Sequence, residues 1–210
     1  MSLIDALNWR YAIKRMNGES ADEDGVARIL DAIHLAPSSY GLQPYSVLVI
    51  RDLALRARLA PAALNQPQIT EGSHLLVFAA WDPVTPEQVD ELIARTAARR
   101  GLPEDKLDGF RQTIKSTLEK LGSDEARYQW AAKQAYLGLG IGLAAAALEH
   151  IDASPMEGFD PAALDRLLEL PSRHLRSVAL MVLGHRDEDN DWLAPMEKVR
   201  WPRARTIIEL

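Results

Sequence analysis

The stretch from Ser123 to His150 constrains the fold most strongly, because a helix-start signal is followed there by a long run without charge. Ser123 is a good N-cap residue, and Asp124 and Glu125 suit the positive end of a helix dipole. No charged side chain occurs in residues 135–148, so no face of that half is suited to water. The sequence therefore predicts a central helix that is buried on all sides.

Glycines at positions 138, 140 and 142 lie inside this predicted helix. Each costs roughly 1 kcal/mol relative to alanine, and the close approach of another backbone would offset that cost. The string GLGIGL also matches part of a dinucleotide-binding motif, but that motif opens a helix instead of lying inside one. We therefore expect tight helix packing, partly against a second copy of the chain. The run is shorter than the roughly 20 apolar residues that a membrane span needs.

The composition narrows the class of protein. With 210 residues, 47% of them hydrophobic, the chain can form a large core, and we expect a single domain. Its net charge of −6 argues against nucleic-acid binding, although it permits a local basic pocket. There is no cysteine, and the 5 histidines lack ligand spacing, so we expect no disulfide and no metal site. The N-terminal residues show no export signal, and the cytoplasm is the expected location.

Hydrophobic patterns predict a sheet flanked by helices. Three aliphatic segments, each expected to be buried on both faces, are predicted strands: Tyr45–Ile50, residues 74–80 and residues 177–184. Predicted helices cover residues 2–9, 22–36, 52–63 and 160–168. Two more polar helices, at residues 86–99 and 103–121, are interpreted as an excursion from the core. Residues 151–160 are expected to be irregular, and the β-prone residues 206–210 could pair with the sheet of a partner.

Two basic clusters and one loop have more than one interpretation. Arg10, Lys14 and Arg15 alternate with apolar residues, and they could form a solvated edge or bind an anion such as phosphate. A second cluster lies at residues 197–203. The loop PSSYGLQP at residues 37–44 is either a simple turn or a segment that could hold the polar edge of a ring.

Several short motifs follow one another in a specific order. They are Arg-x-x-x-Lys at residues 10–14, PSS-x-x-x-QP at 37–44, NQPQ at 65–68 before SHLLVF, WAAKQAYLGLG at 130–140, PMEGF at 155–159 and EKVR at 197–200. In this order they resemble the FMN-dependent nitroreductase family across nearly the whole chain. The resemblance implies an α+β fold with a mixed central sheet flanked by helices, and a homodimer with FMN at the subunit interface. It also implies a ping-pong cycle in which NADH or NADPH reduces the flavin, and nitroaromatics, quinones or other flavins reoxidise it.

The resemblance also implies which residues bind the cofactor. Cations from both ends of the chain would hold the phosphate and the ribityl and pyrimidine side: Arg10, Lys14, Lys198 and Arg200. The backbone at Tyr11 and Ala12 would reach the flavin between the first two. A loop of the other subunit and one residue of the central helix would pack along the ring and ribityl chain: Pro37, Ser38, Ser39, Gly41 and Gln134. Asn65 would bind the pyrimidine edge. The segment beside the flavin would be Pro155, Met156, Glu157 and Gly158.

Catalysis in such a site needs no nucleophile or general base, because hydride transfer depends on positioning and on stabilising negative charge. Lys14 is the expected charge stabiliser, and Glu157 and Gly158 complete the predicted catalytic set. For Glu157 the alternative is a carboxylate that caps a helix or fixes a loop. If the resemblance holds, the backbone at this position matters more than the acid. Tyr40 and Phe110 are candidate linings of the substrate pocket, with residues 86–121 as its rim.

Two positions depart from the family pattern. Gly41 stands where asparagine is frequent, which removes one side-chain contact to the cofactor. Gln68, also a cofactor-binding candidate, stands where some members have lysine. An amide donates a hydrogen bond but no charge, so we expect this flavin to be harder to reduce.

Two other functions are compatible with the sequence. A specialised enzyme of the same fold could cleave a flavin, remove a halogen or oxidise a substrate, and it would turn over quinones and nitroaromatics poorly. A non-catalytic FMN-binding redox sensor would not sustain NAD(P)H oxidation with a quinone. The sequence names neither the physiological acceptor nor the preferred nicotinamide donor.

Overall fold

The computed structural model describes residues 2–210. Its sheet contains the strands β1 (Tyr45–Ile50), β2 (His74–Trp81), β3 (Asp152–Met156) and β4 (Leu175–Gly184) in the order β1-β2-β4-β3. Each neighbouring pair runs antiparallel. The α+β class is confirmed. The described strands do not form the mixed sheet that the resemblance implied, because strand direction alternates along this order.

The helices begin where side chains cap them. Ser2, Asp22, Asp52, Ser123 and Asp160 each accept a hydrogen bond from a backbone N–H in the first turn that follows. These caps explain why the predicted helix starts agree with the structure. The helices are α1 (Leu3–Trp9), α2 (Glu23–His34), α3 (Leu53–Leu59), α4 (Gln68–Glu71), α5 (Pro86–Arg100), α6 (Asp108–Leu121), α7 (Asp124–Leu148), α8 (Pro161–Leu167) and α9 (Arg203–Thr206).

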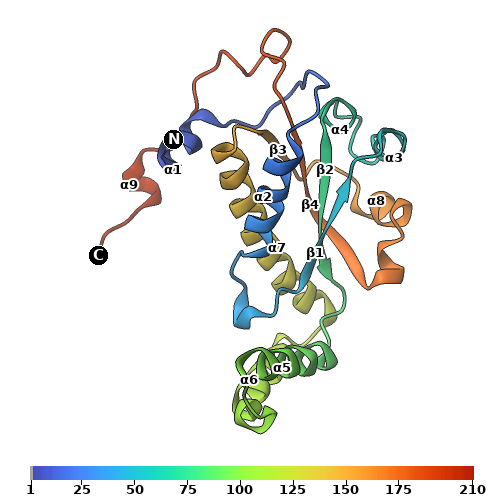
Figure 1. Ribbon diagram of the computed structural model, residues 1–210, viewed down its shortest axis with the longest axis vertical. Coiled ribbons are helices and arrows are strands. Elements are labelled where there is room, and N and C mark those ends of the chain that lie inside the picture. The colour runs from blue at the N-terminus through green and yellow to red at the C-terminus, as the bar shows by residue number, and fades with distance from the viewer. Residues whose placement is uncertain (1) are drawn as a thin grey trace.

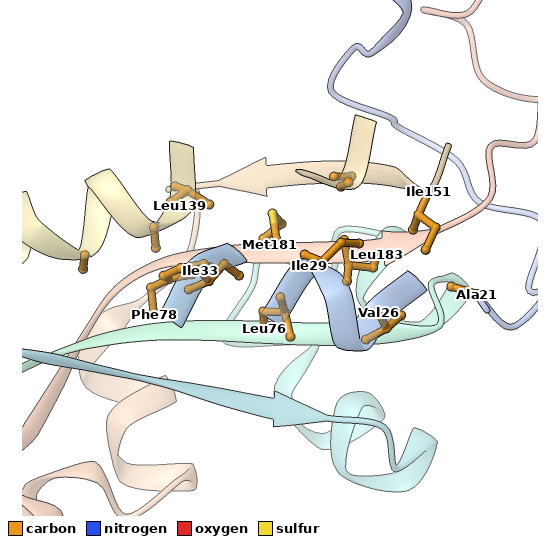
Figure 2. Close-up of a cluster of buried hydrophobic side chains, with 14 residues drawn as sticks. Ala21, Val26, Ile29, Ile33, Leu76, Phe78, Leu139, Ile151, Met181 and Leu183 are labelled. Carbon is orange, nitrogen blue, oxygen red and sulfur yellow. The ribbon is translucent and has the colours of Figure 1, made fainter. Parts of the chain in front are cut away.

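Helices cover both faces of the sheet (Figure 1). On one face, Leu76 and Phe78 of β2 point into a core shared with α2 and α7 (Figure 2). On the other face, Leu75 and Val77 pack in a second core with α3, α4 and α8. Alternate residues of a strand point to opposite sides of the sheet. The prediction that this strand is buried on both faces is therefore confirmed.

The central helix α7 packs closely at two of its glycines. A Cβ atom at Gly138 would lie 2.7 Å from the Tyr45 hydroxyl, and one at Gly142 would lie 2.9 Å from the Ile33 side chain. A Cβ atom at Gly140 would meet nothing within 4 Å. Tight packing is confirmed at Gly138 and Gly142 within a single chain, but side chains, and not the backbone that we expected, lie against these two glycines.

The prediction that α7 is buried on all sides is wrong for one chain. Leu137 is 46% exposed and Ile141 is 41% exposed, and Gly140 lies on the same side. By length and composition alone α7 could cross a membrane, but 50% of its apolar stretch is buried inside the molecule, as in a core helix. The sheet and α2 cover one side of α7, and the described chain leaves an apolar stripe on its other side uncovered.

The two edge strands also differ from the prediction. β1 lies at an edge, and most of its residues are only half-buried. Residues 151–160 were expected to be irregular, but they contain β3, which pairs with β4 at the other edge. Pro155 has no N–H to donate to a neighbouring strand, so the sequence does not predict β3. An edge strand tolerates proline, and β3 lies at an edge.

Two segments extend from this body. α5 and α6 project beyond the end of the sheet and pack with the first turns of α7 around a core of their own (Figure 1). At the C-terminus, residues 207–210 follow α9 without forming a strand in the described structure, and Ile208 is exposed. The pairing of this segment with a partner stays a prediction.

Candidate functional site

The fold brings together the two basic clusters from opposite ends of the sequence. A cavity of about 520 Å³, here called the terminal cleft, lies between residues 8–12 and residues 193–200. The predicted cofactor-binding residues that line it are Arg10, Tyr11, Ala12, Lys198 and Arg200. A wider depression of about 630 Å³ on α5 contains none of the predicted site residues. Size alone therefore does not identify the site.

Cations outnumber acids in the lining of the terminal cleft, where Arg10, Arg186, Lys198 and Arg200 accompany a single carboxylate, that of Glu197. Burial and then the neighbouring Arg200 lower the pKa of Arg10, and the pKa of Lys198 is lowered by burial and then by Arg10 and Arg200. Within residues 2–210, no carboxylate forms an ion pair with Arg10, Lys198 or Arg200. The buried Nε of Arg10 also has no hydrogen-bond partner in the described structure. Clustered like charges with an unpaired donor favour an anionic ligand, and a phosphate group fits this requirement.

Lys198 contributes hydrogen bonds to the fold as well as charge to the cleft. Its ammonium group donates to the backbone carbonyls of Leu7, Asn8 and Arg10, at the C-terminal end of α1. A cation is favoured at that end of a helix dipole. Lys198 therefore ties the C-terminal segment to α1 and keeps Arg200 beside the cleft.

Sequence reasoning misses Arg186, which lines the terminal cleft just after β4. The buried carboxylate of Asp152 accepts hydrogen bonds from the Arg186 guanidinium at 2.6–3.1 Å. The same guanidinium lies 4.3 Å from the ring centre of Trp9 and 4.8 Å from that of Tyr11. Asp152 neutralises the charge of Arg186. The contacts of this guanidinium with Asp152 and with the two rings support the wall of the cleft. Asp152, the one acid in residues 151–154 before Pro155, was the only sign of this contact in the sequence.

Lys14 lies outside the terminal cleft, in a depression of about 310 Å³ that Gln66, Gln68 and Trp192 also line. Gln68 is 2% exposed, and its amide donates to the Ile13 carbonyl at 2.8 Å. We expected the Gln68 amide to donate to the flavin, but it donates to the backbone of Ile13 instead. Gln68 Oε1 is buried without a hydrogen-bond partner among the described residues. The fold brings Lys14 and Gln68 together, but Gln68 offers an acceptor.

The predicted flavin-facing segment is held from two sides. The Tyr136 hydroxyl on α7 donates to Glu157 Oε1, and Gln66 Nε2 donates to the Gly158 carbonyl at 2.8 Å. Burial and then the hydrogen bond to Glu157 raise the pKa of Tyr136, so its hydroxyl keeps its proton at neutral pH. Asn65 lies beside Gln66 in a left-handed turn with a φ of 52°. A cavity of about 330 Å³ here is lined by Tyr136, Leu139, Pro155, Met156, Glu157 and Ala179.

Tyr136 was not among the predicted site residues. Its place inside the motif WAAKQAYLGLG was the only signal, and a tyrosine in an apolar helix is usually a core residue. The contact also shows Glu157 fixing a loop through its carboxylate, which is the alternative that the sequence left open.

The loop at residues 37–41 forms a separate group. Gln134 Oε1 on α7 accepts a hydrogen bond from the Ser39 backbone N–H at 2.8 Å. The rings of Tyr40 and Phe110 meet edge to face at 6.1 Å, and the Tyr40 hydroxyl lies 3.0 Å from Thr117 Oγ1. This loop follows the C-terminal end of α2, whereas residues 10–17 precede its N-terminal end (Figure 1). One chain therefore does not bring Pro37, Ser38, Ser39 and Gly41 to the terminal cleft.

The chain is similar to known proteins over most of its length. A family model described as "Nitroreductase family" matches residues 7–185. An NADH dehydrogenase of Thermus thermophilus is 32% identical over 192 residues, which cover 90% of this chain and 90% of the relative. A protein of Staphylococcus haemolyticus whose name proposes an NAD(P)H nitroreductase is 30% identical over 223 residues, covering 99% of this chain and 96% of that protein. A structure from Exiguobacterium sibiricum solved in complex with FMN matches with a TM-score of 0.81 at 22% identity, covering 99% of this chain and 96% of that one.

Proposed function

The chain belongs to the nitroreductase family of oxidoreductases, and from this premise we propose that it binds FMN and passes hydride from NADH or NADPH to small acceptors such as nitroaromatics or quinones by a ping-pong cycle. The observation that carries the proposal is the terminal cleft, where Arg10 and Arg200 lie together without an ion-pair partner in the described structure. A flavin phosphate would supply the missing negative charge.

Each part of the chain has a distinct role in this proposal. When bound, FMN supplies the hydride-accepting N5 atom. Arg10 and Arg200 would hold its phosphate, and Lys14 would stabilise negative charge on the reduced ring. Gly158 would present its backbone N–H to the ring, with the adjacent Glu157 fixed by Tyr136. The work of the protein is then positioning and charge stabilisation.

We propose that a second copy of the chain completes the site. Two observations support a homodimer: the loop at residues 37–41 is separated from the terminal cleft within one chain, and the α7 stripe at Leu137 and Ile141 is uncovered. Pairing of two such stripes would bury apolar surface and could bring each loop to the cleft of the other copy. Residues 86–121, with Tyr40 and Phe110, would form the rim of the substrate pocket of a single-domain subunit.

We propose that the enzyme is cytoplasmic, because the chain lacks cysteine and its proposed electron donor is a nicotinamide nucleotide. The donor preference and the physiological acceptor are questions for kinetics.

Anaerobic stopped-flow spectroscopy tests the proposed function. The FMN-loaded protein is mixed with NADH or NADPH while the absorbance of oxidised flavin is followed. We expect rapid bleaching, then recovery when a quinone or a nitroaromatic is added, and the faster donor identifies the preference. Bound FMN that neither nucleotide bleaches would contradict the reductase and favour the specialised enzyme or the redox sensor.

A further inference from the structure

A buried carboxylate joins the two segments that form the terminal cleft. Asp191 lies in the loop after β4 and is 2% exposed. Its Oδ2 atom accepts hydrogen bonds from the Lys14 backbone N–H at 2.8 Å and from the Tyr11 hydroxyl at 3.1 Å. Its Oδ1 atom accepts from the Leu193 backbone N–H at 2.9 Å. The donors therefore come from the N-terminal segment on one side and from the C-terminal segment on the other.

Both segments carry cations, and the second also carries one acid, Glu197. Arg10 and Lys14 belong to the first, and Lys198 and Arg200 belong to the second. When no anion is bound, their repulsion favours separation of the segments. Separation would remove donors from Asp191 and leave a buried charge unpaired, which is costly. Asp191 thus resists opening of the cleft, and its own negative charge offsets part of the repulsion.

We propose that Asp191 is a positioning residue that gives the terminal cleft its preference for a phosphorylated flavin. The inference rests on the proposed function, because it takes the FMN phosphate as the ligand of the cleft. Asp191 would not touch the phosphate, since both groups are anions. It acts by holding Arg10 and Arg200 at a separation that lets both cations reach one phosphate. Without this carboxylate Lys198 still ties the C-terminal segment to α1, but the contacts at Tyr11 and Lys14 are lost and the cations converge less closely on one phosphate.

Titration of the apoprotein with FMN and with riboflavin, followed by flavin fluorescence, tests the inference, because riboflavin lacks the phosphate. We expect Asp191→Asn to lower the preference for FMN over riboflavin by about ten- to a hundredfold, because the amide carries no charge and keeps only one of the two acceptor oxygens. The matched control is Asp165→Asn. Asp165 is a carboxylate on α8, 7% exposed, that accepts the Ser177 backbone N–H at 3.0 Å away from the cleft. This variant should keep the wild-type preference even if it is less stable.

An unchanged preference in Asp191→Asn, or an equal fall in both variants, overturns the inference and leaves the proposed function standing. Wild-type protein that binds neither flavin overturns both. Should Asp191→Asn not fold, Tyr11→Phe carries the test, because it removes only the hydroxyl that donates to Asp191. A smaller fall in the same preference supports the inference, and an unchanged preference in that variant overturns it.

Discussion

At the scale of single residues, the cations near the terminal cleft differ in whether a carboxylate faces them. Arg186 pairs with Asp152, and Arg15 pairs with Glu71. Arg10 has no such partner among residues 2–210, and its Nε is buried without an acceptor. A paired cation supports the structure, whereas an unpaired one is available to a ligand. The side-chain type is the same in each case, so pairing decides the role.

Arg10→Met should weaken FMN binding by roughly 1.5–3 kcal/mol, because it removes a charge-assisted hydrogen bond to the phosphate. The loss should be smaller at high ionic strength, since salt screens charges near the surface. Fluorescence titration of the apoprotein measures both effects. Arg99→Met, an exposed arginine on α5, is the control. Equal losses in the two variants would show that Arg10 does not contact the phosphate.

Tyr136→Phe should make stability less sensitive to alkaline pH. Burial and then Glu157 raise the pKa of Tyr136, so the folded state holds this proton more tightly than the unfolded chain does. This tighter binding of the proton stabilises the folded state. The stabilisation is complete below the pKa of about 10 of an unfolded tyrosine and is lost as the pH rises above that value. Urea unfolding at about pH 8 and about pH 11 should therefore show a smaller difference for the variant. Tyr40→Phe, which removes a hydroxyl that lies against Thr117 Oγ1 and not against a carboxylate, should behave like the wild type.

At the scale of elements, α7 meets different requirements on its two sides. Toward the sheet, Gly138 and Gly142 allow Tyr45 and Ile33 to approach the helix backbone. On the other side, Gly140, Leu137 and Ile141 have no partner within the described chain that covers them. The second half of the helix, residues 135–148, is therefore uncharged in sequence but only partly covered in structure.

Gly138→Ala should lower the free energy of unfolding by about 1–3 kcal/mol, because the added methyl group would overlap the Tyr45 side chain. Gly140→Ala has room within one chain and should gain up to about 1 kcal/mol from the higher helix propensity of alanine. Urea unfolding of both variants measures the difference. A Gly140→Ala variant as unstable as Gly138→Ala would contradict the open space at this position and would indicate a second backbone there.

At the scale of the whole molecule, the proposed site depends on surfaces that one chain leaves apart. The terminal cleft lies where the two ends of the chain meet, and the loop at residues 37–41 lies beyond α2. The apolar stripe of α7 at Leu137 and Ile141 is exposed, and we propose that it is the surface for a second copy.

Ile141→Glu should convert the proposed dimer to monomers and release FMN, because a charge at the centre of the α7 stripe cannot be buried without a partner. Size-exclusion chromatography with light scattering gives the mass, and absorbance gives the flavin content. Leu167→Glu is the matched control, since Leu167 is also an exposed apolar residue but lies on α8, over the other face of the sheet. A dimer that survives Ile141→Glu with its flavin bound would contradict the proposed interface.

The sequence alone determined the features that depend on neighbouring residues. Helix starts followed from capping residues such as Ser123 and Asp160, because a cap acts within one turn. The burial of β2 on both faces followed from an unbroken aliphatic run. The order of motifs along the chain was sufficient for the family.

Only the tertiary structure decided the features that depend on residues far apart in sequence. Asp191 and Lys14 are 177 residues apart, and no local pattern could show that a buried carboxylate would hold this backbone. The same holds for the Tyr136–Glu157 contact, for the donor of Gln68 turned toward Ile13, and for β3 as an edge strand. Capping and periodicity are local forces that a sequence displays directly. Which charge is paired and which face is covered depend on packing, and packing exists only in the folded chain.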